Sequence, residues 1–137
     1  MKRSLLACLA GVLTWLVVVT VIDRVLRLTI ADYTIAEKTL QFTLAMKWAR
    51  LTMAIVTSIT AGAVTRWAAP SSRVPAWIVG GIVLAMFVPA HISLWNRFPV
   101  WYHLTFLLTI LPAVLAGATL TRSPVADGGG DRSRLPA

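Results

Sequence analysis

The sequence has only one cysteine, Cys8, among its 137 residues. A single thiol cannot form an intramolecular disulfide, and there is no CxxC pair. The chain therefore lacks the paired cysteines that four-span, quinone-linked disulfide oxidoreductases need. Cys8 lies in an early apolar run, where we expect a buried and unreactive thiol. Charged residues are also scarce: they make up 13% of the chain, against about a quarter in soluble domains.

Acidic residues are rarer still, because aspartate and glutamate together number five and none lies inside an apolar run. Transporters coupled to protons or sodium usually need a carboxylate within the membrane. Small multidrug exporters share this length and number of spans but carry an acidic residue in their first helix, and residues 5–22 have none. The HExxH, P-loop and GxSxG motifs are also absent, so the sequence predicts no enzyme and no metal site of these types.

Apolar residues are what the chain has in abundance, at 58% of the sequence and a mean hydropathy of +0.77. Such a chain cannot cover itself with polar groups, which indicates that its solvent is lipid. Four runs are long enough to cross a hydrocarbon core of about 30 Å. They cover residues 5–22, 48–67, 76–94 and 100–121. The sequence therefore predicts an all-α membrane protein, with four transmembrane helices in an up-down bundle formed by residues 1–121.

The second helix is expected to extend outside the bilayer, because Thr34 and Glu37 have the spacing of a capping box well before the span. Trp48 and Trp67 flank that span and suit the two membrane interfaces. Residues 122–137 contain three successive glycines, two prolines and several charges. This composition predicts a disordered C-terminal tail.

The net charge of +8 comes from basic residues that are scattered around the apolar runs, with no cluster of five or more. This pattern does not favour a nucleic-acid partner and is typical of topology signals and lipid headgroup contacts. Four spans place both termini on one side of the membrane. The positive charges near the ends of the short segments on that side are Lys2, Arg3, Arg66 and Arg73. They favour cytoplasmic termini, and we expect a multi-pass protein of a bacterial inner membrane.

Both histidines lie in the stretch HISLWNRFPVWYH, residues 91–103, which joins the third and fourth spans. His91 lies about one turn before the end of one span and His103 about one turn into the next, so their depths match. They are the candidate cofactor-binding residues, because two imidazoles on adjacent helices can hold a haem or contact a quinone. The alternative is that both rings belong to an interfacial belt of tryptophan and tyrosine side chains and bind no cofactor.

Two arginines are candidates for lipid or anion contacts. Arg50 lies near the edge of the second span, where it can reach lipid phosphates, bind an anion or pair with Asp23. Arg97 lies in the turn between the last two spans and can also reach phosphates.

A face of small residues in the second span is the predicted helix-packing surface. Its members recur every four positions and are Ala54, Ser58 and Gly62. Small side chains let helix backbones approach closely, either within the bundle or between copies of the chain.

These features predict a non-enzymatic accessory, scaffold or assembly subunit that packs against other membrane helices or against itself, with the lipid bilayer as its other partner. Two alternatives stay open. One is a membrane-anchor redox subunit with haem or quinone near His91 and His103, and the other is a small uncoupled channel or facilitator.

Overall fold

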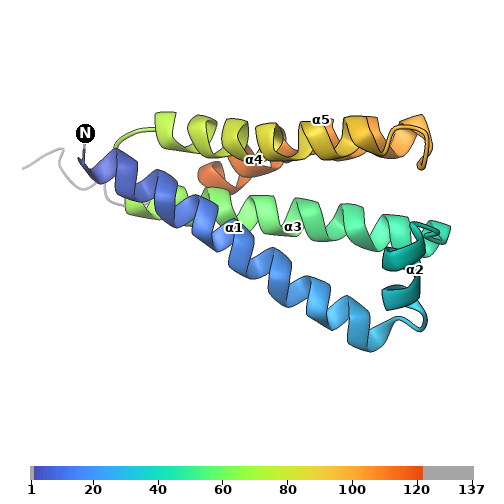
Figure 1. Ribbon diagram of the computed structural model, residues 1–137. Helices are drawn as coiled ribbons and strands as arrows, with labels where there is room; N and C mark the ends of the chain where they lie inside the picture. Colours follow the sequence, from blue (N-terminus) through green and yellow to red (C-terminus); the bar gives the residue numbers. More distant parts are fainter. Residues whose placement is uncertain (1, 122–137) are drawn as a thin grey trace, which may run out of the picture.

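The computed structural model describes residues 2–121, and helices are the only regular elements within that range. They are α1 (Lys2–Thr29), α2 (Tyr33–Thr39), α3 (Leu44–Ala68), α4 (Val74–Ser93) and α5 (Val100–Leu120). The four long helices run along a common direction, and α2 is a short segment at one end of them (Figure 1). The expected all-α fold is confirmed for the described residues. The predicted disordered tail, residues 122–137, lies outside them.

Three of the long helices, α1, α4 and α5, are long and apolar enough to cross a membrane. The helix at the predicted second span, α3, has the length but is not among the three. Its charged residues and its five hydroxyl side chains lower its apolar character. At three of the four predicted spans, the structure therefore has a helix that could cross a membrane by its length and composition.

The helix α3 lies at the centre of the bundle, against α1 on one side and α5 on the other. Two glycines produce the closest approach. A Cβ atom at Gly62 of α3 would collide with the backbone of Val114, and one at Gly117 of α5 would collide with the backbone of Ile59. Each helix thus presents a glycine to the backbone of the other, and only residues without a side chain permit this separation.

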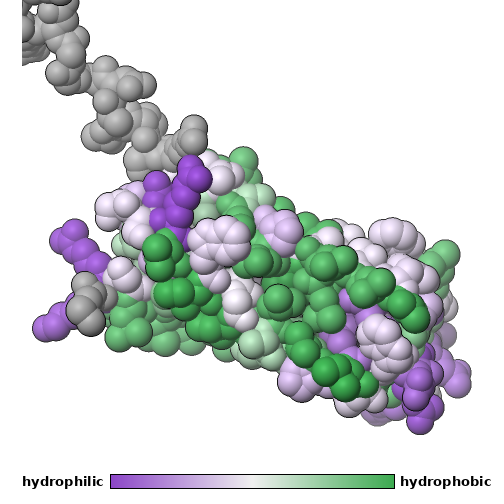
Figure 2. Space-filling view, turned by 90° about the horizontal axis from the view of Figure 1, so that it is seen from above, coloured by the Kyte–Doolittle hydropathy of each residue, from purple (hydrophilic) through white to green (hydrophobic). Residues whose placement is uncertain are grey.

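Apolar side chains from all four long helices form the core between them. Trp15 of α1, Leu51 of α3, Val79 of α4 and Ile110 of α5 are all buried there. Many other leucine and valine side chains are exposed, especially on α1. On the face shown in Figure 2, apolar residues cover the middle of the molecule and hydrophilic residues gather towards its two ends. This distribution is the one expected of a protein whose middle lies in lipid.

The short helix α2 fills the space that opens where α1 diverges from α3 (Figure 1). Residues in the left-handed backbone conformation bound it on both sides, with φ of 61° at Asp32 and 59° at Leu40. Aspartate tolerates this conformation readily, whereas leucine rarely adopts it. The chain therefore turns sharply twice within a few residues, which sets α2 apart from both long neighbours.

The expectation of one continuous second helix that extends out of the bilayer is wrong. Leu40 ends α2, and α3 begins afresh with Thr43 as its N-cap, whose side chain accepts a hydrogen bond from the Met46 amide at 3.3 Å. Thr34 lies inside α2 and does not cap a helix. The predicted capping partner, Glu37, forms ion pairs with arginines of the neighbouring helices, and these tertiary contacts override the local pattern.

Candidate functional site

Most of the sequence-predicted site residues gather at one end of the bundle. The C-terminal end of α1, the whole of α2, the beginning of α3 and the turn between α4 and α5 meet there. His91, His103 and Arg50 all line one cavity of about 190 Å³ at this end.

The two histidines are in direct contact. Their Nδ1 atoms lie 2.8 Å apart, and both rings are buried. A hydrogen bond between two such nitrogens requires that one carries a hydrogen and the other accepts it. Trp95 stacks on His103 with ring centroids 4.9 Å apart, and Phe106 lies 4.6 Å from the His91 ring. The sequence prediction of matched depth therefore corresponds to a hydrogen-bonded pair enclosed by aromatic rings.

This arrangement does not fit a haem held between the two rings. With metal–nitrogen bonds of about 2 Å, imidazoles on opposite sides of one iron lie about 4 Å apart. The facing nitrogens are much closer, and aromatic rings cover both imidazoles. The 190 Å³ cavity beside them is also smaller than the roughly 300–1,000 Å³ of usual small-molecule sites. Within residues 2–121, no three His, Cys, Asp or Glu side chains cluster as metal ligands would.

Arg50 is held by residues of α2 and of the connection that follows it. Its Nη1 donates to the Tyr33 hydroxyl at 3.2 Å and to Glu37 Oε1 at 3.4 Å, and its guanidinium lies 4.9 Å from the centre of the Phe42 ring. Burial raises the pKa of the Tyr33 phenol above its ordinary value, and the nearby positive charge of Arg50 opposes that change. The Tyr33 phenol therefore stays protonated and available to accept this hydrogen bond.

The alternative in which Arg50 pairs with Asp23 is wrong. Asp23 instead accepts from Arg27, one turn further along α1, at 2.8 Å. Arg27 also contacts Glu37 at 3.0 Å, so Glu37 bridges Arg27 of α1 and Arg50 of α3. A geometric reason is visible in Figure 1, because α1 and α3 have diverged at this end and α2 lies between them.

Sequence reasoning missed this bridging role of Glu37. A usable signal was present, since Glu37 is the only glutamate of the chain and arginines precede and follow it at several positions. A carboxylate with arginines on the helices before and after it can form an ion-pair network as well as a local helix cap.

The remaining candidates lie in two different environments. Arg97 is exposed in the turn between α4 and α5 and has no ion pair among the described residues. The small-residue face of α3 is buried inside the bundle, where Ser58 accepts a hydrogen bond from the Trp15 indole at 3.2 Å. Ala54 and Gly62 are likewise buried, so this face packs within the chain.

The arrangement at this end offers guanidinium donors, two partly buried carboxylates and a pair of imidazoles among aromatic rings. Such groups can bind and orient anionic or aromatic molecules, and they also fasten helices to one another. Comparison with protein-family models, with curated proteins and with solved structures finds no match to this chain.

Proposed function

We propose that this chain is a four-span integral membrane protein of a bacterial inner membrane, arranged as an up-down bundle with both termini in the cytoplasm. The placement of tryptophans supports α3 as the fourth span. Trp48 and Trp67 are both exposed near the two ends of α3. At the rise of an α-helix they lie about 28 Å apart along the axis, close to the roughly 30 Å of a hydrocarbon core.

The same spacing recurs on a second helix. Trp77 lies near the start of α4 and Trp95 just after its end, and both are exposed. They are about 27 Å apart at helical rise. Trp101, at the start of α5, packs against Trp48 with ring centroids 5.7 Å apart. This spacing supports two helices that share the same pair of interfaces. The hydroxyl side chains of Thr57, Ser58 and Thr65 are buried in the protein interior, which favours α3 as a span in lipid.

We propose further that the protein is a non-enzymatic accessory subunit that uses α1 to pack against a helix of another membrane protein. The exposure of α1 is the observation that carries this role. Only 22% of its apolar segment is buried by the rest of the chain, against 39% for α5. Large apolar side chains recur on its outer side every four residues and are exposed: Leu9, Leu13, Val17 and Val21. Such a row forms a ridge that can enter the groove of a neighbouring helix.

Photo-crosslinking in intact membranes tests this role. A photoreactive amino acid at Leu13 or Val17 should give one major protein adduct, while the same group at Val12, which packs against the core, should not. Identification of the adduct by mass spectrometry, followed by loss of that complex in a Leu13→Ala, Val17→Ala double variant, would support the proposal. If both outer positions give only lipid adducts, the proposed accessory role is contradicted.

The observations favour an accessory role over an uncoupled channel. The α3 hydroxyls of Thr57 and Ser58, which a polar conduit would use, are fully buried between packed helices. An ion-flux assay in liposomes provides the check, since substantial flux of any small ion through the purified protein would favour the channel instead.

A further inference from the structure

A cavity of about 380 Å³ lies between the C-terminal half of α1 and the helices α3, α4 and α5. It exists because α1 leans away from α3 after the contact of Trp15 with Ser58, and α2 fills the widening gap only at its far end. The volume falls within the roughly 300–1,000 Å³ typical of sites for small molecules.

One end of this cavity is aromatic. Trp15 and Phe87 lie with ring centroids 5.1 Å apart, and Phe87 and Phe106 lie 5.0 Å apart. The indole N–H of Trp15 is already donated to Ser58. The inner end therefore offers an apolar surface, which suits a hydrocarbon chain.

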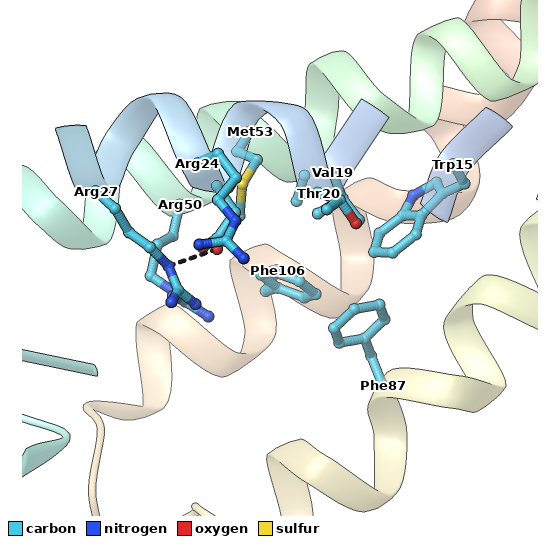
Figure 3. Close-up of a pocket in the computed structure, with 11 residues that line it drawn as sticks. Trp15, Val19, Thr20, Arg24, Arg27, Arg50, Met53, Phe87 and Phe106 are labelled. Carbon is cyan, nitrogen blue, oxygen red and sulfur yellow. Dashed lines mark hydrogen bonds and ion pairs between the residues drawn. The ribbon is translucent and has the colours of Figure 1, made fainter. Parts of the chain in front are cut away.

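The other end carries positive charge. Figure 3 shows the guanidinium groups of Arg24, Arg27 and Arg50 near one another and apart from Trp15 and Phe87, with the Phe106 ring between the two groups. Asp23 and Glu37 supply two carboxylates to this group, both engaged by Arg27 or Arg50. Three guanidiniums thus face two carboxylates, and one positive charge is left over. Arg24 is the member of the three that has no ion pair among the described residues.

The two ends lie at different depths. Arg24 follows the apolar run of residues 5–22, whereas Trp15 lies inside it, about 14 Å away along the helix axis. If α1 crosses the bilayer, the charged end lies at the level of the lipid headgroups and the aromatic end lies within the hydrocarbon. A molecule that matches both ends must itself be amphiphilic.

We propose that this cavity binds an amphiphile with a single negative charge, whose headgroup lies at Arg24 and whose hydrocarbon chain lies against Trp15 and Phe87. One unbalanced guanidinium matches one anionic group, and the planar guanidinium binds phosphate or carboxylate oxygens with two hydrogen bonds. The headgroup chemistry is shared by an anionic phosphodiester lipid and by a fatty acid. This site is distinct from the surface proposed for the accessory role, because the cavity is lined by Trp15 and Val19 of α1, which do not belong to the exposed row of apolar side chains.

Native mass spectrometry of the full-length protein, released from detergent micelles, tests the site. Four probes are compared: phosphatidylglycerol, zwitterionic phosphatidylcholine, oleate and inorganic phosphate. One phosphatidylglycerol or one oleate should remain bound, with at least tenfold preference over phosphatidylcholine, and the stronger of the two identifies the headgroup. Inorganic phosphate alone should not bind, because it cannot use the aromatic end. Equal retention of phosphatidylglycerol and phosphatidylcholine, with no oleate bound, would overturn the proposal.

Two variants and a matched control locate the binding. Arg24→Gln should reduce the preference for the anionic probe about tenfold, whereas Lys38→Gln, which removes an equal charge from an exposed residue of α2 at the same end of the molecule, should not. Val19→Trp should occupy the cavity and abolish retention, with unchanged helix content by circular dichroism. Arg24 is exposed, so its variant tests the site even if the larger side chain at position 19 disturbs folding. Equal losses in the Arg24 and Lys38 variants would mean general surface attraction and would contradict a built site.

Discussion

The apolar segment of α1 and the helix α3 differ in composition and in burial. The apolar segment of α1 is rich in leucine and valine, yet only four residues of the helix are buried. The helix α3 carries three basic residues and five hydroxyl side chains, yet nine of its residues are buried. In water the more apolar helix would be the inner one. In lipid, hydrocarbon solvates leucine as well as a protein core does, so small and polar residues decide which helix is central.

The largest expected effect comes from separating α3 from α5. Gly62→Val should destabilise the fold by more than about 3 kcal/mol, because the new side chain would collide with the Val114 backbone and the helices would have to move apart. Unfolding by sodium dodecyl sulfate in mixed micelles measures the change. Gly81→Val is the matched control, since a Cβ at Gly81 meets no atom within 4 Å, and it should be nearly neutral. Similar losses in both variants would contradict the close approach.

Truncation of one leucine to alanine in each helix should show the difference in burial between α3 and α1. Leu51→Ala in α3 should cost about 3 kcal/mol, because that side chain is only 2% exposed and its removal leaves a cavity. Leu13→Ala in α1, where the side chain is 52% exposed, should cost about 0.5 kcal/mol or less. The micelle unfolding assay compares the two, and equal costs would mean that α1 is not an outer helix.

Glu37 connects α1 and α3 through its two ion pairs, so its substitution should weaken the contact between these helices. Glu37→Gln should cost about 2 kcal/mol, because Arg27 of α1 and Arg50 of α3 both lose their charged partner in α2. Lys38→Gln changes the next side chain, which forms no ion pair among the described residues, and should have little effect. Faster amide hydrogen exchange over residues 30–43 in the first variant alone would localise the change. Unaltered exchange there would show that the ion pairs are dispensable.

The smallest effects are expected from the buried hydroxyl side chains of α3. The hydroxyl of Thr57 is buried with no hydrogen-bond partner in the structure. Thr57→Val should therefore increase the free energy of unfolding by about 1 kcal/mol and raise the melting temperature. Ser58→Ala should instead lower stability by a similar amount, because the Trp15 indole would lose its acceptor. Destabilisation by Thr57→Val would mean that this hydroxyl has a partner, such as a bound water.

The sequence predicted α1, α4 and α5 well, because each rests on a long apolar run. The first helix extends beyond its predicted span. The apolar run stops at residue 22, but α1 continues to Thr29, where the ion pair of Asp23 with Arg27 has the spacing of one helical turn. The sequence could not predict α2, because the left-handed turn at Leu40 and the contacts of Glu37 depend on tertiary structure.

The sequence also gave only part of the candidate site. Matched depth of His91 and His103 follows from their distances to the helix ends, but their contact depends on how α4 and α5 are rotated about their axes, which hydropathy does not reveal. The cavity beside Arg24 was equally invisible, because it arises from the tilt of α1. Residue types indicate what a helix can contact, whereas rotation and tilt decide what it does contact.

The paired glycine contacts between α3 and α5 bear on how the chain assembles. Gly62 and Gly117 are separated by the whole of α4 and the turn that follows it, so this contact can form only after the last helix has been synthesised. Until then, the face of α3 that receives α5 has no cover. The packing of α3, the least apolar of the long helices, is therefore completed only when α5 has been synthesised. A nascent chain that stops after α4 would leave α3 without its closest neighbour.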